Sequence, residues 1–219
     1  MLSCIKIDSI NCNFFMEPYS TNSSNSHSPV LPTKPIKKES FLGEIVKFTI
    51  VALFIVLPVR LFIAQPFIVS GASMDPTFAT GEYLIVDQLS YHVGNPTRGQ
   101  VAIFKYPKDE TKYFIKRVIG LPGETVIING TNVIIKNKEH PDGFTLNEPY
   151  ISLNNEKEDT QTTTLKPGEY FVMGDNRKES FDSRSWGILP RDLIIGTPFV
   201  RLFPANKISI FPGDFKEAK

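Results

Sequence analysis

The hydrophobic pattern divides the chain into three regions of different character. Residues 1–40 are polar and rich in Ser, Asn and Pro, a composition that buries too little apolar surface to offset the entropy of ordering. Residues 41–65 hold one strongly apolar stretch, uncharged from Phe48 to Val59. From residue 66 to about 216, short apolar runs alternate with Gly and Pro. We therefore predict a disordered tail, an apolar helix and a β-rich domain.

The apolar helix has the features of a membrane anchor. Lys47 and Arg60 bracket its uncharged core and can extend toward the lipid headgroups, so that about 20 residues span the hydrocarbon layer. A buried or interfacial helix is the alternative, because the uncharged run alone is short. Three preceding lysines favour a cytoplasmic N-terminus: Lys34, Lys37 and Lys38. The β-rich domain is then on the export side of the membrane.

The region after the anchor has the composition of β-strands. Runs rich in β-branched and aromatic residues occur at 83–87, 100–105, 113–119 and 169–173. Asn129-Gly130 stands between two further apolar runs and predicts a type I′ hairpin. Residues 137–168 are polar and irregular, and we expect an exposed excursion that carries little chemistry. The fold predicted from this pattern is mostly β.

Charge and composition exclude several classes of function. The formal net charge is +1, which argues against the broad basic field of a nucleic-acid-binding protein. Cys4 and Cys12 are the only cysteines and both lie in the tail, so the β-rich domain has no disulfide framework or thiolate metal site. The three histidines are scattered in polar surroundings, and we expect no metal centre.

Ser73 follows the apolar segment closely, within Ser70-Gly-Ala-Ser-Met-Asp-Pro-Thr77. A serine hydroxyl becomes a useful nucleophile only when a neighbouring group takes its proton. His92 and His140 are the only histidines after the anchor, and neither has an acidic residue in a suggestive setting. A Ser-His-Asp triad stays open as the weaker alternative, because triads follow no fixed sequence spacing.

Lys116 is the better candidate for a base. Strand parity puts Phe114, Lys116 and Val118 on one face. If that face is covered, desolvation lowers the lysine pKa and leaves a neutral amine. The alternative is a lysine that protects an exposed edge strand.

The stretch after the last predicted strand is dense in glycine, charge and serine. Asp175 and Asp182 resemble a paired-carboxylate acid–base site, but the nearby Arg177 and Arg184 favour salt-bridged structural acids. Ser180 can hydrogen-bond a lysine amine and orient it.

Four motifs in this order, after an anchor, resemble the type I signal peptidases, membrane-anchored serine endopeptidases that remove signal peptides from exported proteins. The motifs are Ser70-Gly-Ala-Ser-Met-Asp-Pro-Thr77, Arg98-Gly-Gln-Val-Ala-Ile-Phe-Lys-Tyr-Pro107, Lys116-Arg-Val-Ile-Gly-Leu-Pro-Gly-Glu124 and Gly174-Asp-Asn-Arg-Lys-Glu-Ser-Phe-Asp-Ser-Arg-Ser-Trp-Gly187. Each motif alone is weak, but their order over residues 41–211 is specific.

The resemblance implies a role for each matching residue. Ser73 would be the nucleophile and Lys116 the general base of a Ser–Lys dyad that works through an acyl-enzyme. Ser180 matches the serine that hydrogen-bonds the lysine. The other supporting positions of the last motif are Asp175, Arg177 and the ion pair Asp182–Arg184. No metal or organic cofactor is implied.

The resemblance also implies a fold, a substrate and a location. The fold would be an antiparallel coiled sheet with an apolar surface resting on the membrane, to which Phe67, Ile68, Val69 and Phe78 could contribute. Substrates would be exported preproteins with small residues before the cleaved bond, bound in shallow pockets that Val69 and Ile115 line. The membrane would be the plasma membrane or an internal one such as a thylakoid. The oligomeric state stays open.

Gly71 departs from part of the family. Some members have a serine two positions before the nucleophile, and its hydroxyl helps to hold the oxyanion; others have glycine. The backbone N–H of Ser73 is one donor here, and the second is unassigned. We expect a substitute donor, and Ser70 is nearby in sequence.

Two rival functions stay open at this point. Self-cleaving transcriptional repressors use a Ser–Lys dyad on a related β fold, but they carry a DNA-binding domain where this chain has an anchor. A catalytically inactive, membrane-anchored homologue could bind exported proteins. The joint presence of Ser73, Lys116 and Ser180 favours a peptidase.

Overall fold

The computed structural model describes residues 41–58, 64–152, 154 and 157–215. The predicted tail, residues 1–40, lies outside these ranges. The described helices are α1 (Phe41–Pro58), α2 (Leu89–Val93) and α3 (Ser183–Trp186), with two single-turn 3-10 helices, η3 (Arg191–Leu193) and η4 (Ala205–Lys207).

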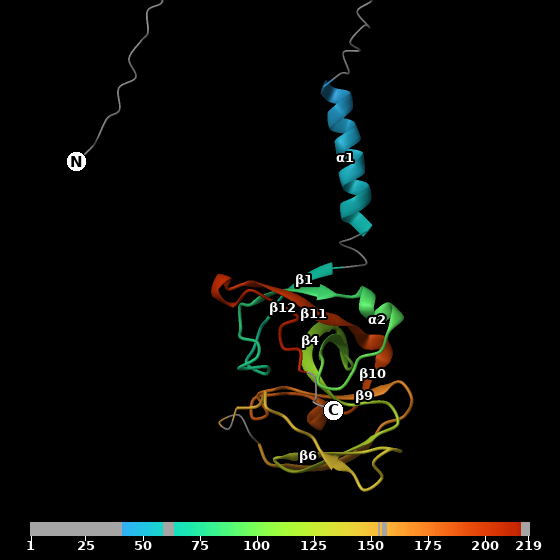
Figure 1. The fold of residues 1–219 in the computed structure, drawn as a ribbon, viewed down its shortest axis with the longest axis vertical. Coiled ribbons are helices and arrows are strands. Elements are labelled where there is room, and N and C mark those ends of the chain that lie inside the picture. Colours follow the sequence, from blue (N-terminus) through green and yellow to red (C-terminus); the bar gives the residue numbers. More distant parts are fainter. Residues whose placement is uncertain (1–40, 59–63, 153, 155–156, 216–219) are drawn as a thin grey trace, which may run out of the picture. The chain divides into compact units, whose positions relative to one another are not determined.

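Helix α1 contains the apolar run that the sequence singled out (Figure 1). It ends at Pro58, the residue type that cannot continue a helix. No helix among the described residues has both the length and the apolar character needed to cross a membrane. The predicted anchor, residues 41–65, includes residues 59–63, which lie outside the description. The anchor stays a prediction.

Antiparallel strands form most of the regular secondary structure in the remaining described residues, as the sequence predicted. The strands are β1 (Ala64–Ile68), β2 (Tyr83–Asp87), β3 (Val101–Tyr106), β4 (Asp109–Gly120), β5 (Thr125–Gly130), β6 (Asn132–Lys136), β7 (Phe144–Thr145), β8 (Asp159–Thr164), β9 (Glu169–Met173), β10 (Leu189–Pro190), β11 (Ile194–Phe203) and β12 (Ser209–Ile210). Within the described residues they make an eight-stranded sheet, ordered β1-β2-β11-β3-β4-β9-β10 with β12 on β11, and a four-stranded sheet, ordered β7-β6-β5-β8 (Figure 1).

Three buried clusters hold these sheets. One centres on β3, β4 and β9 and includes Trp186. A second joins the four-stranded sheet to β4 and β9 through Ile119 and Phe171. The third packs Met74 and Phe78 against the start of β3 and lies beneath the Ser73 loop. Burial of this apolar area is the main stabilising term of the domain.

The segment 137–168 is more ordered than the sequence suggested. It contains β7 and β8, and it buries Leu146 and Leu165 in the second cluster. Its polar composition hid these strands because β8 reads Asp-Thr-Gln-Thr-Thr-Thr and alternates between half-buried and exposed positions. This segment also supplies partners to the motifs, as described below.

The prediction of which residues form the exposed apolar surface was partly wrong. Val69 and Phe78 are 5% and 0% exposed, so neither can face a membrane. Ile68 is 66% exposed, in agreement with the expectation. Most exposed apolar side chains of the β-rich domain lie instead on β11, η4, β12 and their flanks: Phe199, Leu202, Phe203, Ile208, Ile210 and Phe211.

Candidate active site

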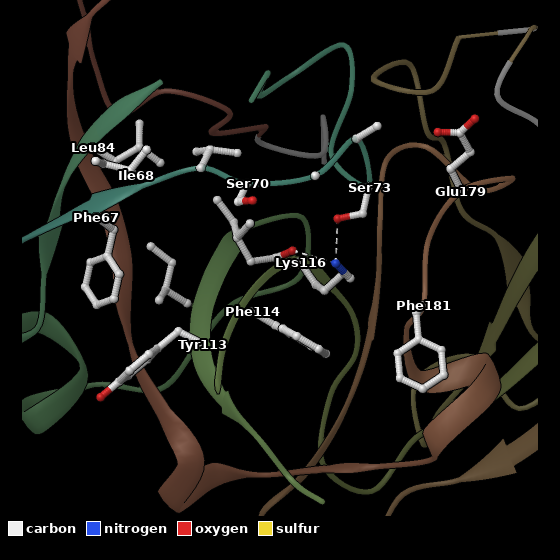
Figure 2. A pocket seen from close by; sticks show the side chains of 15 residues that line it. Phe67, Ile68, Ser70, Ser73, Leu84, Tyr113, Phe114, Lys116, Glu179 and Phe181 are labelled. Carbon is white, nitrogen blue, oxygen red and sulfur yellow. Dashed lines mark hydrogen bonds between the residues drawn. The ribbon is translucent and has the colours of Figure 1, made fainter. Parts of the chain in front are cut away.

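Ser73 lies in a compact loop between β1 and β2. The ends of this loop meet where the Val69 N–H donates to the Glu82 carbonyl, at 2.9 Å. Met74 and Phe78 anchor its underside in the core. The buried anchors on one side leave the Ser73 side chain on the other, facing a cavity (Figure 2).

Gly71 takes a conformation that suits glycine. Its φ is +98°, in the left-handed region that side chains disfavour. Its N–H donates to Thr80 Oγ1 at 3.1 Å, and the Thr80 hydroxyl donates back to the Gly71 carbonyl at 3.0 Å. The Gly71 N–H is therefore engaged and is not a free oxyanion donor.

Lys116 lies in the interior of the eight-stranded sheet. Strand β4 runs between β3 and β9, with Lys116 opposite Ala102 on β3 and its neighbour Arg117 opposite Met173 on β9. Lys116 is only 4% exposed. The edge-strand interpretation of this lysine is therefore wrong.

The structure brings Lys116 and Ser73 together. The Lys116 amine and the Ser73 hydroxyl oxygen are 2.7 Å apart, and the amine also donates to the Ile115 carbonyl at 3.0 Å (Figure 2). The Phe114 ring lies over the amine, 5.5 Å from its centroid. Burial lowers the pKa of the Lys116 amine to about 8, although the charges of Asp182 and Asp175 oppose this shift. A neutral amine is therefore accessible near physiological pH.

Asp175 is a structural acid, but its partner is not the one expected. Arg117 on β4 holds its carboxylate through two hydrogen bonds, at 2.8 and 2.5 Å. The Thr77 hydroxyl donates to the same carboxylate at 2.5 Å. Arg177, the expected neighbour, pairs instead with Glu148 in the segment 137–168. Proximity in sequence was misleading because Arg117 and Arg177 are both buried and each pairs with an acid on a different segment of the chain.

Asp182 and Arg184 form the expected ion pair, at 2.9 Å. The Asp182 carboxylate also accepts from the Gly174 N–H at 3.1 Å. Burial alone would raise the pKa of Asp182, but its hydrogen bonds and ion pair with Arg184 and the hydrogen bond from the Gly174 N–H lower it overall. The carboxylate therefore stays ionised and supports the loop. Asp175 and Asp182 bind different arginines and do not form an acid–base pair.

Ser180 lies beside the site without the hydrogen bond to Lys116 that we expected. Its hydroxyl oxygen is buried and meets no hydrogen-bond geometry with any described residue. It packs against Gly174, where an added Cβ would collide with both the Ser180 hydroxyl and the Ser73 carbonyl oxygen. Glycine at 174 thus allows the two loops to approach closely.

Asn176 is a residue that the sequence reasoning missed. Its side-chain amide donates to the Ala72 carbonyl and its backbone N–H donates to the Ser73 carbonyl, each at 3.1 Å. It therefore holds the backbone of the Ser73 loop from the opposite loop. Its position between Asp175 and Arg177 was a signal, but an asparagine in a polar loop also fits a solvated turn.

A cavity of about 310 Å³ opens in front of Ser73 and Lys116. Val69 and Ile115 line it, as expected, together with Ser70. The remaining lining residues include Phe67, Tyr113, Glu179 and Phe181. The Ser73 N–H donates to no described residue, so it remains available to a ligand in this cavity.

The histidines do not belong to this cavity. His92 Nδ1 lies 2.9 Å from the Gln88 carbonyl in α2, and His140 packs against Phe144. Neither lines the cavity of Ser73. Within the described part of the chain, the amine of Lys116 is thus the base that touches the serine.

Comparison with known proteins identifies the family of this chain. The model of the family described as "Signal peptidase, peptidase S26" matches residues 42–203. Signal peptidase I of Leptolyngbya laminosa is 35% identical over 85% of this chain and 95% of its own length. "Probable signal peptidase I-1" of Synechocystis sp. is 39% identical over 76% of this chain and 85% of its own. "Signal peptidase I P" of Bacillus subtilis subsp. natto is 36% identical over 80% and 96%, respectively.

A solved structure is also similar. A crystal structure of a signal peptidase I from Enterococcus faecalis is 30% identical, with a TM-score of 0.40, and the match covers 48% of this chain and 97% of that one. The extent of the family match and the identities of the relatives define a peptidase class. The chain belongs to the type I signal peptidase family, peptidase S26.

Proposed function

We propose that this protein is a membrane-bound serine endopeptidase that cleaves N-terminal signal peptides from exported preproteins. The observation that carries the proposal is the 2.7 Å contact between the Ser73 hydroxyl and a buried amine, Lys116, with a pKa lowered to about 8. An inactive binding homologue has no need of this contact.

The reaction starts with proton transfer. The neutral Lys116 amine takes the Ser73 proton as Ser73 Oγ attacks the peptide carbonyl carbon. The resulting ammonium returns the proton to the leaving amine, which frees the new N-terminus and leaves an acyl ester on Ser73. The neutral Lys116 amine then takes a proton from water as the water oxygen attacks the ester carbonyl carbon. The ammonium returns this proton to Ser73 Oγ as the ester bond breaks, which releases the signal peptide and restores the serine hydroxyl and the neutral amine.

The substrate can lie extended along β4. This strand pairs with β3 along its length, but it pairs with β9 only from Arg117 onward. Its other edge before Lys116 is unpaired among the described strands and can accept a peptide strand. Val69 and Ile115 then border the positions before the cleaved bond, where their bulk favours small side chains.

The oxyanion would form next to the Ser73 N–H, which is unoccupied. The Gly71 N–H is engaged by Thr80, so the second donor must come from elsewhere. Ser70 lines the cavity and its hydroxyl is the nearest candidate in sequence. A Ser70→Ala enzyme that cleaves at the wild-type rate would remove Ser70 from this role.

The remaining motif residues support the dyad. Asp182 with Arg184 fixes the loop through Gly174, and Asp175 with Arg117 ties that loop to β4. Ser180 packs against Gly174 in the same loop, and its buried hydroxyl has no hydrogen-bond partner among the described residues.

The membrane is the second partner in the proposal. Residues 41–65 would anchor the chain, with the N-terminus in the cytoplasm and the β-rich domain on the export side of the plasma membrane or of a thylakoid membrane. The exposed apolar side chains of β11 and β12 would rest on the lipid.

Purified full-length protein in detergent, mixed with a preprotein that has a cleavable signal peptide, tests the dyad. Ser73→Ala and Lys116→Met should each lower the cleavage rate by at least about 10²-fold, because each removes a reacting group. Lys112→Met is the matched control, since this lysine is on the same strand but exposed. Cleavage by either dyad variant at the control rate contradicts the proposal.

The pH profile tests the base. The value of kcat/KM should rise with pH around a midpoint near 8, because Lys116 must lose its proton before it can act. A profile that is flat between pH 7 and 9 would exclude Lys116 as the titrating base.

A further inference from the structure

The two ends of the cavity differ in charge (Figure 2). Phe67, Ile68 and Tyr113 lie at one end, and the rings of Phe67 and Tyr113 meet edge to face at 5.4 Å. Glu179 and the ring of Phe181 lie on the other side, and Ser73 with Lys116 lies between the two ends in this view. One end of the cavity is therefore apolar, and the other has a carboxylate besides an aromatic ring.

The carboxylate of Glu179 is unpaired among the described residues. It makes no hydrogen bond or ion pair with any residue that the structure describes. The neighbouring Lys178 does not neutralise it, because that amine donates to the Asn154 carbonyl at 2.6 Å. The side chain is exposed at the cavity rim, so a ligand in the cavity can reach it.

The position of Glu179 is linked to that of the nucleophile. The Glu179 N–H donates to Asn176 Oδ1 at 3.3 Å, and the same Asn176 holds the carbonyls of Ala72 and Ser73. The carboxylate is thus attached to the same scaffold as the reacting hydroxyl. A fixed negative charge next to a binding cleft selects among ligands by their charge.

We propose that Glu179 is a specificity-determining residue that favours a basic side chain in the first two positions after the cleaved bond. The inference rests on the proposed function: if the small residues before that bond occupy the apolar end, the leaving half of the substrate must pass Ser73 toward Glu179. A carboxylate there attracts lysine or arginine and repels aspartate or glutamate.

Six signal-peptide substrates test the inference with the full-length enzyme in detergent. They carry Lys, Gln or Glu at the first or at the second position after the cleaved bond. At low salt, wild type should prefer Lys to Glu at one of these positions by roughly two- to fivefold in kcat/KM, the range of an exposed ion pair. Glu179→Gln should abolish the preference and Glu179→Lys should reverse it.

Two controls make the outcome specific. Glu139→Lys carries the same charge change outside the cavity and should keep the wild-type ratio. High salt should shrink the wild-type ratio, because screening weakens exposed charges. Each ratio is taken within one enzyme, so a general loss of rate in a variant cancels.

The possible results separate the two proposals. Equal Lys-to-Glu ratios in wild type and Glu179→Lys, with normal cleavage of the Gln substrates, overturn the specificity inference alone. Failure of wild type to cleave any of the six substrates overturns the proposed function and the inference with it.

Discussion

At the scale of single residues, the surroundings of one amine determine its protonation. Lys116 is 4% exposed, and the Phe114 ring and the Ser73 hydroxyl lie next to its amine. Desolvation disfavours the charged form, so that the amine loses its proton more readily and its burial costs stability. An apolar residue at this position would make the protein more stable, and the proposed role as a base accounts for a lysine here.

Stability should depend on pH through this lysine. Its pKa is about 8 when folded and 10.5 in the unfolded chain, so between these values the unfolded state binds more protons and stability rises with pH. The rise should be about 3 kcal/mol at most, from about 1.4 kcal/mol per pKa unit. Denaturant unfolding of wild type and Lys116→Met at pH 7.5 and 10.5 measures it.

The variant serves as the reference for this effect. Lys116→Met lacks the titrating group, so its stability should not show this rise with pH. Its free energy of unfolding at pH 7.5 should exceed that of wild type. An identical pH dependence in the two proteins would mean that Lys116 is not buried as described.

At the scale of elements, Arg117 connects parts of the chain that are distant in sequence. It holds Asp175 in the loop after β9 and donates to the carbonyls of Gly99 and Gly213, at 2.6 and 2.7 Å. It also stacks over Tyr150 in the segment 137–168. The residue next to the candidate base is thus the structural centre of the site.

Removal of Arg117 should be strongly destabilising. Arg117→Met leaves the carboxylate of Asp175 buried without its cation, which typically costs about 3–5 kcal/mol. Lys112→Met on the same strand breaks only a solvent-exposed pair with Asp109 and should cost little stability. Urea unfolding in detergent compares the two variants, and equal losses of stability would contradict the structural role of Arg117.

At the scale of the whole molecule, the buried ion pair between Arg201 and Glu82 connects β11, which has exposed apolar side chains, to the loop that holds Ser73. Arg201 on β11 binds Glu82 at 3.2 Å and donates to the Thr77 carbonyl at 2.9 Å. The same strand carries exposed apolar side chains, including Phe203, which is 58% exposed. A membrane contact on this surface would therefore lie close to the loop that holds Ser73.

Replacement of exposed apolar side chains on this surface by polar ones should slow cleavage at a membrane but not in detergent. A double variant, Ile208→Asn with Ile210→Asn, removes two side chains that are 59% and 67% exposed and should fold normally. We expect severalfold slower cleavage of a full preprotein in lipid vesicles and unchanged cleavage of a short peptide in detergent. Thr162→Asn, exposed on β8, is the control. Equal rates in vesicles would exclude a role of this surface.

The local patterns of the chain predicted about half of the strands and singled out Ser73 and Lys116 as candidate site residues. Alternating β-branched and aromatic runs predicted β2 and β9 with their observed bounds, because strand periodicity is a local property. The order of the four motifs identified Ser73 and Lys116 before any geometry was known. The strands outside the predicted runs were missed: β1, β7, β8, β10, β11 and β12. The burial of β7 and β8 depends on a neighbouring sheet and leaves little periodic signal.

Only the tertiary structure decided which groups meet. The sequence suggested Arg177 as the partner of Asp175, whereas folding pairs Asp175 with Arg117 and Arg177 with Glu148. It left open whether Lys116 lay on an edge strand, and it did not place Glu179 at the cavity or pair Asn176 with the backbone of Ala72 and Ser73. Residue types and periodicity follow from the chain itself, but burial, charge pairing and a lowered pKa depend on neighbours that are far away in sequence.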